Sequence, residues 1–311
     1  MSSESGTESI VMHHSHNFKR FSSEECLPCV LGIDEAGRGP VLGPMVYGCA
    51  VSPLDCEDKL RELGVADSKA LSEEKRTQIF DRMCDAGDRC SEFVGYVVQV
   101  LSAQFISGSM LRRSKYSLND VSHDAAMSLI QSCIDAGIQV QEVLVDTVGP
   151  PESYQAKLTA KYPSIKFTVA KKADSVYPVV SAASIAAKVT RDRVVRDWQF
   201  VENASGTTVV QVPENGFGSG YPGDPDTKKF MESCVDRVFG YPSLVRFSWS
   251  TAETVLELKA VRTKWDDDPD SAAASGTLSL LNFFGKSDAS SKAVQRHAYF
   301  IDRHMHSATS F

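Results

Sequence analysis

The chain has 311 residues, of which 42% are hydrophobic and 23% are charged, and its formal net charge is −7. This balance is typical of a globular protein, and no run approaches the roughly 20 apolar residues of a membrane helix, so the composition argues against a membrane-spanning protein. The first 20 residues are polar and lack the apolar core of a signal peptide, which predicts an intracellular protein.

The first half of the chain predicts a polar arm, three strands and a helix. Residues 1–27 form the arm, and a strand from Cys29 to Asp34 leads into a glycine-rich turn. A second strand covers Met45 to Val51, a helix opens at Ser72 and runs to about Asp85, and the valine-rich run from Phe93 to Leu101 is typical of a third strand.

The second half predicts alternating helices and strands. The predicted elements are a helix over Asn119 to Ala136 closed by Gly137, a strand over Glu142 to Asp146, a helix over Pro151 to Lys161, a strand over Ile165 to Ala170, a helix from Pro178 to Trp198 and a helix starting at Pro225. Strands that alternate with helices indicate an α/β domain. We assign this domain to residues 28–200 and a helical region to residues 201–264.

The composition changes after this region. Residues 265–276 consist of Trp265 and the run DDDPDSAAASG, a composition typical of a flexible linker. We interpret residues 277–311 as a tail for partner contacts.

Cysteine and histidine give little evidence of a zinc site. The eight cysteines are scattered, which suits a reducing compartment. Cys26 and Cys29 form one C-x-x-C pair without a second pair at zinc-ribbon distance, so a metal or redox role stays an alternative. His13, His14 and His16 are interpreted as part of the polar arm rather than as metal ligands.

Acidic residues follow three of the predicted strands. Asp34 and Glu35 follow the first strand, Asp146 ends another, and Asp174 comes shortly after the strand that ends at Ala170. In open α/β sheets ligands gather beyond the carboxyl ends of strands, so distant acids can meet there. A single aspartate after a strand more often caps a helix, but two adjacent acids gain nothing from packing.

Clustered carboxylates repel one another unless a cation neutralises them. Oxygen ligands without His or Cys select Mg²⁺ or Mn²⁺ rather than zinc. Two such ions about 4 Å apart activate a water and stabilise the leaving oxygen of a phosphodiester. The pattern therefore predicts a metal-dependent phosphodiester chemistry.

The turn after the acid pair reads Gly37-Arg38-Gly39. Glycines let a backbone approach a ligand closely, and arginine suits phosphate. A nucleotide-binding loop is the alternative, but the chain has no G-x-x-x-x-G-K-[ST] and no G-x-G-x-x-G that opens a helix.

The string from Ile33 to Pro40 (IDEAGRGP) resembles the signature of type 2 ribonucleases H, the ribonuclease HII family. Further stretches resemble the family in the same order, and they are Ala66 to Lys69, Val145 to Gly149, Lys172 to Ser184, Gly218 to Pro222 and Ser307 to Ser310. The resemblance covers residues 28–251 densely, and the tail resembles the eukaryotic branch. It implies a ribonuclease H-like mixed sheet flanked by helices, with a smaller helical C-terminal region.

The family's functional residues carry over to matching positions. The resemblance makes Asp34, Glu35, Asp146 and Asp174 the catalytic, metal-binding acids that hold two Mg²⁺ or Mn²⁺ ions. It makes Gly37, Arg38 and Gly39 the loop that senses the ribose 2′-hydroxyl, and Tyr221 the residue that stacks on the neighbouring deoxyribose. Lys69, Lys172 and Ser184 are further substrate contacts, although a lysine taken alone is more often a solvated charge.

Local charge supports a nucleic-acid substrate despite the negative total, because binding depends on patches. Residues 157–196 carry nine basic residues, opposed only by Asp174 and Asp192. The basic residues are Lys157, Lys161, Lys166, Lys171, Lys172, Lys188, Arg191, Arg193 and Arg196.

The implied reaction is hydrolysis of RNA in RNA–DNA hybrids and on the 5′ side of ribonucleotides embedded in DNA, leaving 3′-hydroxyl and 5′-phosphate ends. The resemblance also implies two non-catalytic accessory subunits, a nuclear location, and roles in DNA repair and replication. The stretch from Thr277 to Phe284 resembles the motif that docks on sliding clamps, with Thr in place of Gln. Packing against one of the accessory subunits is the alternative for its Leu280, Phe283 and Phe284.

Two other functions compete with this interpretation. A non-catalytic nucleic-acid-binding scaffold would have no use for the four acids. A resolvase or integrase would not need Gly37-Arg38-Gly39 together with Tyr221, and it would cut DNA that contains no ribose.

Overall fold

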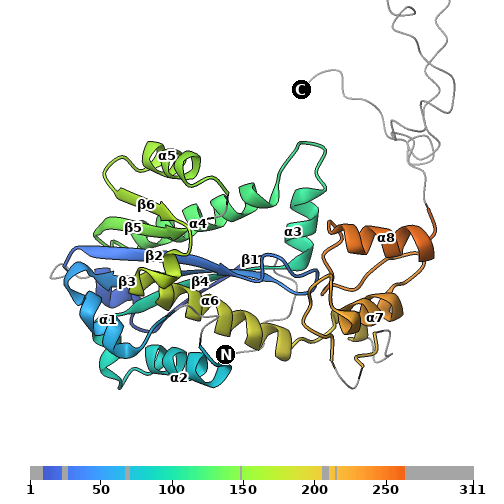
Figure 1. Ribbon diagram of the computed structural model, residues 1–311, viewed down its shortest axis with the longest axis horizontal. Helices are drawn as coiled ribbons and strands as arrows, with labels where there is room; N and C mark the ends of the chain where they lie inside the picture. The colour runs from blue at the N-terminus through green and yellow to red at the C-terminus, as the bar shows by residue number, and fades with distance from the viewer. Residues whose placement is uncertain are drawn as a thin grey trace, which may run out of the picture. The chain divides into compact units, whose positions relative to one another are not determined.

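The computed structural model describes residues 10–22, 27–66, 71–147, 149–204, 210–213 and 216–262. Within these residues six strands form one sheet in the order β1-β4-β3-β2-β5-β6 (Figure 1). The strands are β1 (Ile10–His14), β2 (Cys29–Ala36), β3 (Met45–Pro53), β4 (Gly95–Leu101), β5 (Val140–Asp146) and β6 (Lys166–Ala170). The helices are α1 (Glu57–Leu63), α2 (Glu73–Cys84), α3 (Ala103–Met110), α4 (Leu118–Asp135), α5 (Pro151–Lys161), α6 (Pro178–Arg196), α7 (Pro225–Cys234) and α8 (Ser250–Lys259).

The sheet is mixed. Strands β1, β4, β3 and β2 pair antiparallel, whereas β2, β5 and β6 pair parallel. Parallel neighbours need a crossover, and α5 supplies it between β5 and β6. This arrangement brings the carboxyl ends of β2, β5 and β6 to one edge of the sheet, where the predicted acids lie.

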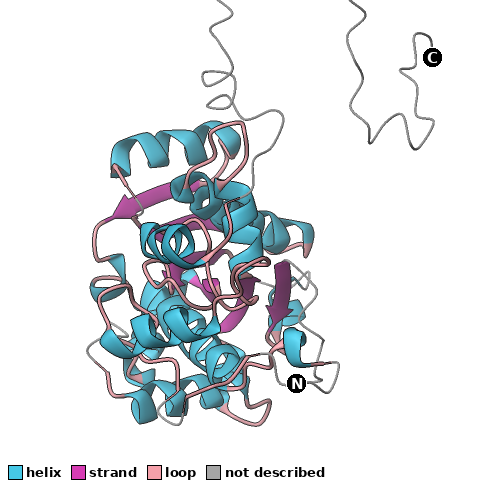
Figure 2. Ribbon diagram, turned by 90° about the vertical axis from the view of Figure 1, so that its right-hand side faces the viewer, coloured by secondary structure: helices cyan, strands magenta, loops and turns pink. Residues whose placement is uncertain are grey.

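Helices cover both faces of the sheet (Figure 2). The side chains of β3 alternate between the faces: Met45, Tyr47 and Cys49 join the hydrophobic core under α4, and Val46 and Ala50 join the core under α6. Since all nine residues of β3 are buried, this strand is the centre of the fold. The observed sheet and its helical layers confirm the expected fold class.

Helix α6 lies unusually close to the sheet because two strand residues are glycines. A Cβ at Gly32 would lie 2.4 Å from the carbonyl carbon of Val179, and one at Gly48 would lie 2.5 Å from the carbonyl oxygen of Ala183. Any side chain at these positions would push the helix away. The close approach brings Ser184 of α6 beneath the end of β2.

Helices α7 and α8 pack around a third core. It contains Phe230 and Leu244 together with Val41 and Leu42, which follow the glycine-rich turn. The N–H of Val41 donates to the carbonyl of Gly220 at 2.8 Å, and that of Gly43 donates to Leu244 at 2.7 Å. The C-terminal helices are thereby connected to the turn that follows β2.

Most predicted elements are confirmed to within a few residues, but the prediction of a flexible N-terminal arm is wrong for residues 10–22. Ile10–His14 pairs antiparallel with β4, and the side chains of Phe18 and Phe21 are buried in the core under α4. Phe21 packs where Gly95 has no side chain, since a Cβ there would lie 2.6 Å from its ring. Burial of two phenylalanine rings outweighs the polarity of the surrounding sequence.

Three helices were not predicted, namely α1, α3 and α8, and β2 extends past Asp34 to Ala36. Cys29 is a fully buried strand residue, whereas Cys26 lies outside the described residues. Lys69, the linker at 265–276 and the stretch from Thr277 to Phe284 also lie outside them. Among the described helices, none combines the length and the apolarity that crossing a membrane requires.

Candidate active site

Three of the four predicted acids lie together at the carboxyl edge of the sheet. Carboxylate oxygens of Asp34, Glu35 and Asp146 all lie within 4.8 Å of one another, and we call these residues the acid group. Their proximity follows from strand register, because Ile33 of β2 is paired with Val145 of the parallel neighbour β5. The residues that follow this pair are therefore adjacent as well.

The two acids of β2 point to opposite faces of the sheet, as neighbouring strand residues do. Asp34 faces α6, where the Ser184 side chain hydrogen bonds to its carboxylate. Glu35 faces the α4 side, where its charge acts on the buried hydroxyls of Tyr47 and Tyr154. The acid group thus sits across the end of the sheet with access to both layers.

Burial makes the acid group electrostatically costly. Asp34 is only 6% exposed. Loss of hydration, followed by repulsion from Glu35 and Asp146, raises its pKa well above the usual aspartate value, while the Ser184 hydrogen bond opposes the rise. The N–H of Glu35 also donates to Asp34 Oδ1 at 2.7 Å. Two donors are insufficient to offset a buried carboxylate beside two others, so the site is suited to a bound cation.

The donor set fits a hard divalent ion. Only carboxylates contribute to the acid group, and no His or Cys joins it among the described residues. Oxygen ligands of this kind favour Mg²⁺ or Mn²⁺.

Asp174 lies beside the acid group but is not part of it. It belongs to the 3-10 turn η4 (Ala173–Ser175), is buried, and its carbonyl accepts a hydrogen bond from Ser181 Oγ at 2.5 Å. The preceding N–H, that of Ala173, donates to Asp146 Oδ1 at 2.8 Å. The structure therefore ties the Asp174 turn to Asp146 without placing the fourth carboxylate among the other three.

The glycine-rich turn continues directly from the acid group. Gly37 has a φ of 78°, and a Cβ there would lie 2.0 Å from Nε of Arg191. Gly39 is exposed, and a Cβ there would lie 3.3 Å from Cε1 of Tyr221. We call residues 37–39 the sensor loop, after the role that the family resemblance implies for them. The loop passes between Arg191 and Tyr221, and the close packing against Arg191 requires a glycine at position 37.

The side chain of Arg38 contacts α4. Its guanidinium donates to Asn119 Oδ1 at 2.5 Å and to the hydroxyl of Ser122. The sequence pattern favoured phosphate as the partner of this arginine, but in this structure the guanidinium fastens the sensor loop to the first turns of α4. Arg38 and Gly39 also line an open cavity of about 420 Å³ with Met110, Leu118, Ser248, Trp249 and Ser250.

Tyr221 is 54% exposed and lies on a loop that Asp224 organises. The Asp224 carboxylate accepts hydrogen bonds from the N–H of Ser219 and from the N–H of Asp226, the latter at 3.0 Å, where it caps α7. The Ser219 contact is the largest cause that lowers the pKa of Asp224 to about 2. An ionised carboxylate therefore fixes the loop that presents Tyr221.

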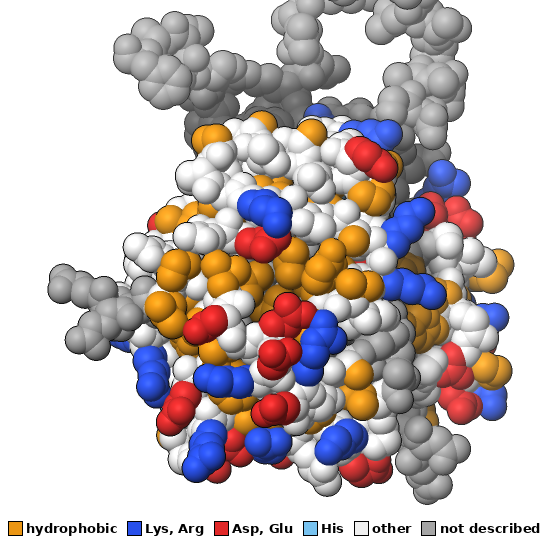
Figure 3. Space-filling model, turned by 60° about the vertical axis from the view of Figure 1, so that its left-hand side comes forward, with side chains coloured by type: hydrophobic (Ala, Val, Ile, Leu, Met, Phe, Trp, Pro, Cys, Tyr) orange, Lys and Arg blue, Asp and Glu red, His pale blue; other side chains and the backbone are white. Residues whose placement is uncertain are grey.

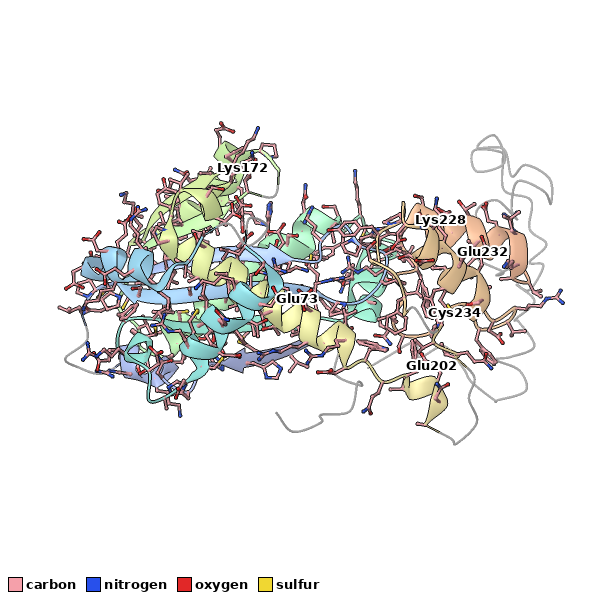
Figure 4. All side chains as sticks on the ribbon, turned by 60° about the horizontal axis from the view of Figure 1, so that its bottom comes forward. Glu73, Lys172, Glu202, Lys228, Glu232 and Cys234 are labelled. Carbon is pink, nitrogen blue, oxygen red and sulfur yellow. The ribbon has the colours of Figure 1, made fainter. Side chains whose placement is uncertain are left out.

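The remaining predicted contacts are dispersed. Lys172 is exposed and is the only non-glycine residue with a positive φ, 55°, in the described part of the chain. Figure 4 shows it at the end of the molecule formed by α5 and β6, away from Glu202 and Cys234 near α7.

Ser184, predicted as a substrate contact, is buried against Asp34. On the face in Figure 3, basic side chains lie among acidic ones and do not form one basic field.

The residues that hold the sensor loop were not predicted from the sequence. Arg246 and Trp249 contact it from the segment before α8, and Asn119 contacts it from α4. A signal for one of them was present: Arg246 is a single charge in the apolar run Leu244-Val245-Arg246-Phe247, where an arginine is buried only if it has partners.

Comparison with known proteins gives consistent matches. Residues 31–252 match the ribonuclease HII family. The chain is 50% identical over 285 residues to the A subunit of ribonuclease H2 of Caenorhabditis elegans, covering 92% of this chain and 94% of that protein. The crystal structure of the ribonuclease H2 from Pyrococcus horikoshii OT3 has a TM-score of 0.56 at 32% identity and covers 74% of this chain and 98% of its own. The ribonuclease HII of Archaeoglobus fulgidus, solved as a PCNA complex, has a TM-score of 0.56 at 28% identity and covers 77% and 99%.

Proposed function

Because the chain belongs to the ribonuclease HII family, we propose that it is the catalytic subunit of a metal-dependent endonuclease that cuts RNA in RNA–DNA duplexes. Its substrates are the RNA strand of hybrids and single ribonucleotides embedded in duplex DNA, which it cuts on the 5′ side. The observation that carries this proposal is the acid group, built from adjacent parallel strands and continued directly by the sensor loop.

The acid group is the metal site of this proposal. Asp34, Glu35 and Asp146 would hold two Mg²⁺ or Mn²⁺ ions, and Asp174 would contribute from the turn tied to Asp146. Such ions, when bound, lower the pKa of water and stabilise the leaving oxygen of a phosphodiester, giving 3′-hydroxyl and 5′-phosphate ends. Ser184 orients Asp34 by its hydrogen bond, and α6 keeps bulk water from that face of the site.

The sensor loop distinguishes RNA from DNA in this proposal. A 2′-hydroxyl both donates and accepts hydrogen bonds, and glycines allow backbone groups to reach it. The half-exposed ring of Tyr221 lies beside Gly39, where it can stack on the deoxyribose next to the ribonucleotide. Lys172 and Lys69 contact phosphates. A resolvase-type nuclease would need no such pairing of loop and tyrosine.

Assembly and location extend the proposal. The Caenorhabditis elegans relative is named as one lettered subunit of ribonuclease H2, which supports a complex with further subunits, two of them in the proposal that the resemblance implies. The Archaeoglobus fulgidus relative was solved with PCNA, which supports clamp binding as one role for Thr277 to Phe284 in this chain, with packing on an accessory subunit as the alternative. We place the protein in the nucleus, with roles in ribonucleotide excision repair and RNA primer removal.

The direct test is a cleavage assay on a DNA duplex that contains one ribonucleotide, with an all-DNA duplex of the same sequence as control. The assay is run with Mg²⁺, with Mn²⁺ and with chelator, and with and without the accessory subunits. We expect one cut on the 5′ side of the ribonucleotide that depends on the metal. Equal cutting of the all-DNA duplex would indicate a resolvase-type nuclease, and absence of cutting in every condition would leave only the nucleic-acid-binding scaffold.

A further inference from the structure

Arg246 is a fully buried arginine whose hydrogen bonds all go to backbone carbonyls near the sensor loop. Its relative exposure is 0%. Nη2 donates to the carbonyl of Gly37 at 2.6 Å, Nη1 donates to that of Arg38 at 3.0 Å, and Nε donates to that of Gly43 at 2.8 Å. One planar guanidinium therefore holds three carbonyls of the same turn, two of them consecutive.

Trp249 holds the third carbonyl of the sensor loop. Its indole Nε1 donates to the carbonyl of Gly39 at 3.1 Å. The indole ring lies 4.8 Å from the guanidinium carbon of Arg246, a cation–π distance. The carbonyls of residues 37, 38 and 39 are thus all captured by two side chains from one segment, which lies far along the chain between α7 and α8.

This capture fixes the direction of the N–H groups. In a planar trans peptide, the N–H points opposite to the carbonyl of the preceding residue. Since the carbonyls of Gly37 and Arg38 point to Arg246, the N–H groups of Arg38 and Gly39 point away from it. Gly39 is exposed and Tyr221 lies beside it, so these two donors face the accessible side of the loop.

A second buried arginine supports the same turn. Arg191 is 7% exposed and donates to the carbonyls of Leu42 at 3.1 Å and Pro44 at 3.2 Å. Burial, with the charge of Arg191 as a smaller cause, lowers the pKa of Arg246 to about 9. Burying two like charges is costly, and the hydrogen bonds that both arginines donate to the carbonyls of this turn offset the cost.

We propose that Arg246, assisted by Trp249, is a positioning residue that sets the selectivity of the enzyme for ribose. It aims the N–H groups of Arg38 and Gly39 at the sugar-phosphate next to the acid group. This inference rests on the proposed function, because it assigns the origin of the ribose preference at that site. Arg246 does not touch substrate; it acts through the orientation of two peptide planes.

Only an arginine has the geometry for this role. Its rigid fork presents donors in several directions at once, whereas a lysine presents donors from one atom and cannot span three carbonyls. Arg246→Lys keeps the positive charge and removes the fork. Arg193→Lys is the matched control, because Arg193 also has defined partners but lies away from the loop: it pairs with Asp81 at 2.6 Å and lies over the Phe80 ring.

The test measures binding in an inactive Asp34→Asn background with Mg²⁺ present. The Kd is determined for a duplex with one ribonucleotide and for the all-DNA duplex, and the ratio of the two is the readout. We expect the background protein to prefer the ribonucleotide, Arg246→Lys to lower this preference by about tenfold or more, and Arg193→Lys to keep it. Partial unfolding would weaken both duplexes equally and leave the ratio unchanged.

Trp249→Phe is the second variant, for use if Arg246→Lys does not fold. It keeps an aromatic ring over Arg246 but removes the bond to the Gly39 carbonyl, so we expect a smaller loss of preference in the same direction. An unchanged ratio in the folded variants would overturn the role of Arg246. A background protein that binds both duplexes equally would instead overturn the proposed function, and this inference with it.

Discussion

The acid group and the sensor loop are neighbours in space, and Asp34 and Glu35 directly precede the loop in sequence, yet different interactions hold the two regions in place. The acids take their positions from strand pairing, since β2 and β5 are hydrogen-bonded parallel neighbours and their ends coincide. The sensor loop has no regular structure, and side chains from α4, α6 and the segment before α8 determine its shape. A precise site can thus combine a rigid ladder with an irregular loop that is held by side chains on distant segments.

The two regions also differ in what would change their stability. The acid group is destabilised by like charges at low hydration, which raises the pKa of Asp34. The sensor loop is unstrained as it stands, because Gly37 adopts its positive φ freely, but a Cβ at this position would lie 2.0 Å from Nε of Arg191. Removing a charge should therefore stabilise the first region, whereas adding an atom should damage the second.

The largest effect is expected for Asp34→Asn. The amide has nearly the same shape but cannot serve as an anionic metal ligand, so we expect kcat to fall by ~10³-fold or more. Because a buried, repelled carboxylate is removed, Tm should stay equal or rise by a few degrees. Steady-state cleavage and thermal unfolding check both parts. A clear drop in Tm would contradict the claim that this acid is kept at a cost to stability.

Gly37→Ala should be the next most damaging change. The new Cβ meets Arg191 and the residue prefers negative φ, so we expect a loss of about 2 kcal/mol in stability together with a large loss of cleavage. Denaturant unfolding and kcat give the two values.

Gly64→Ala provides the matched control for that change. Gly64 ends α1 with a φ of 84°, and a Cβ there would meet nothing within 4 Å. It should cost only the backbone strain and leave cleavage intact. If the two variants lose the same stability and Gly37→Ala keeps full activity, crowding by Arg191 has no role in shaping the loop.

Tyr221→Ala should have an intermediate effect that depends on the substrate. Loss of the ring contact with the deoxyribose should lower kcat/KM for a single embedded ribonucleotide about tenfold, and lower it less for a continuous RNA–DNA hybrid. Tyr221→Phe keeps the ring and should retain most activity. Equal losses on the two substrates would remove the tyrosine from recognition of the junction.

Asp224→Asn should give the smallest effect, visible mainly as a change in acid sensitivity. The folded pKa of Asp224 is depressed to about 2, below the unfolded value near 3.8. Its stabilising effect is therefore complete above pH 4 and is lost as the pH falls toward 2. The variant should show a slightly lower Tm at pH 7 and a smaller further decrease at pH 3 than the unchanged protein. Parallel Tm curves for the two proteins would contradict this assignment.

Much of the fold was predictable because the spacing of hydrophobic residues and the residues that begin or end helices are local features of the sequence. Pro151 at the start of α5 and Ser72 as the cap of α2 predicted these helices almost to the residue. The strand at Ile10–His14 was not predictable, since its stability comes from pairing with β4 and from the burial of Phe18 and Phe21 in a distant core. The short helices α1 and α3 likewise depend on packing more than on their own sequence.

The sequence alone determined the chemistry of this protein: acids at the ends of apolar strands, a glycine pair in the next turn, and their order along the chain. The tertiary structure decided which acids actually meet, leaving Asp174 beside the other three, and it turned Arg38 toward α4. It also placed Arg246 and Trp249 behind the sensor loop. The ends of strands are set by the local sequence pattern and by strand register. The hydrogen bonds to the carbonyls of the sensor loop depend instead on side chains that become neighbours only after folding.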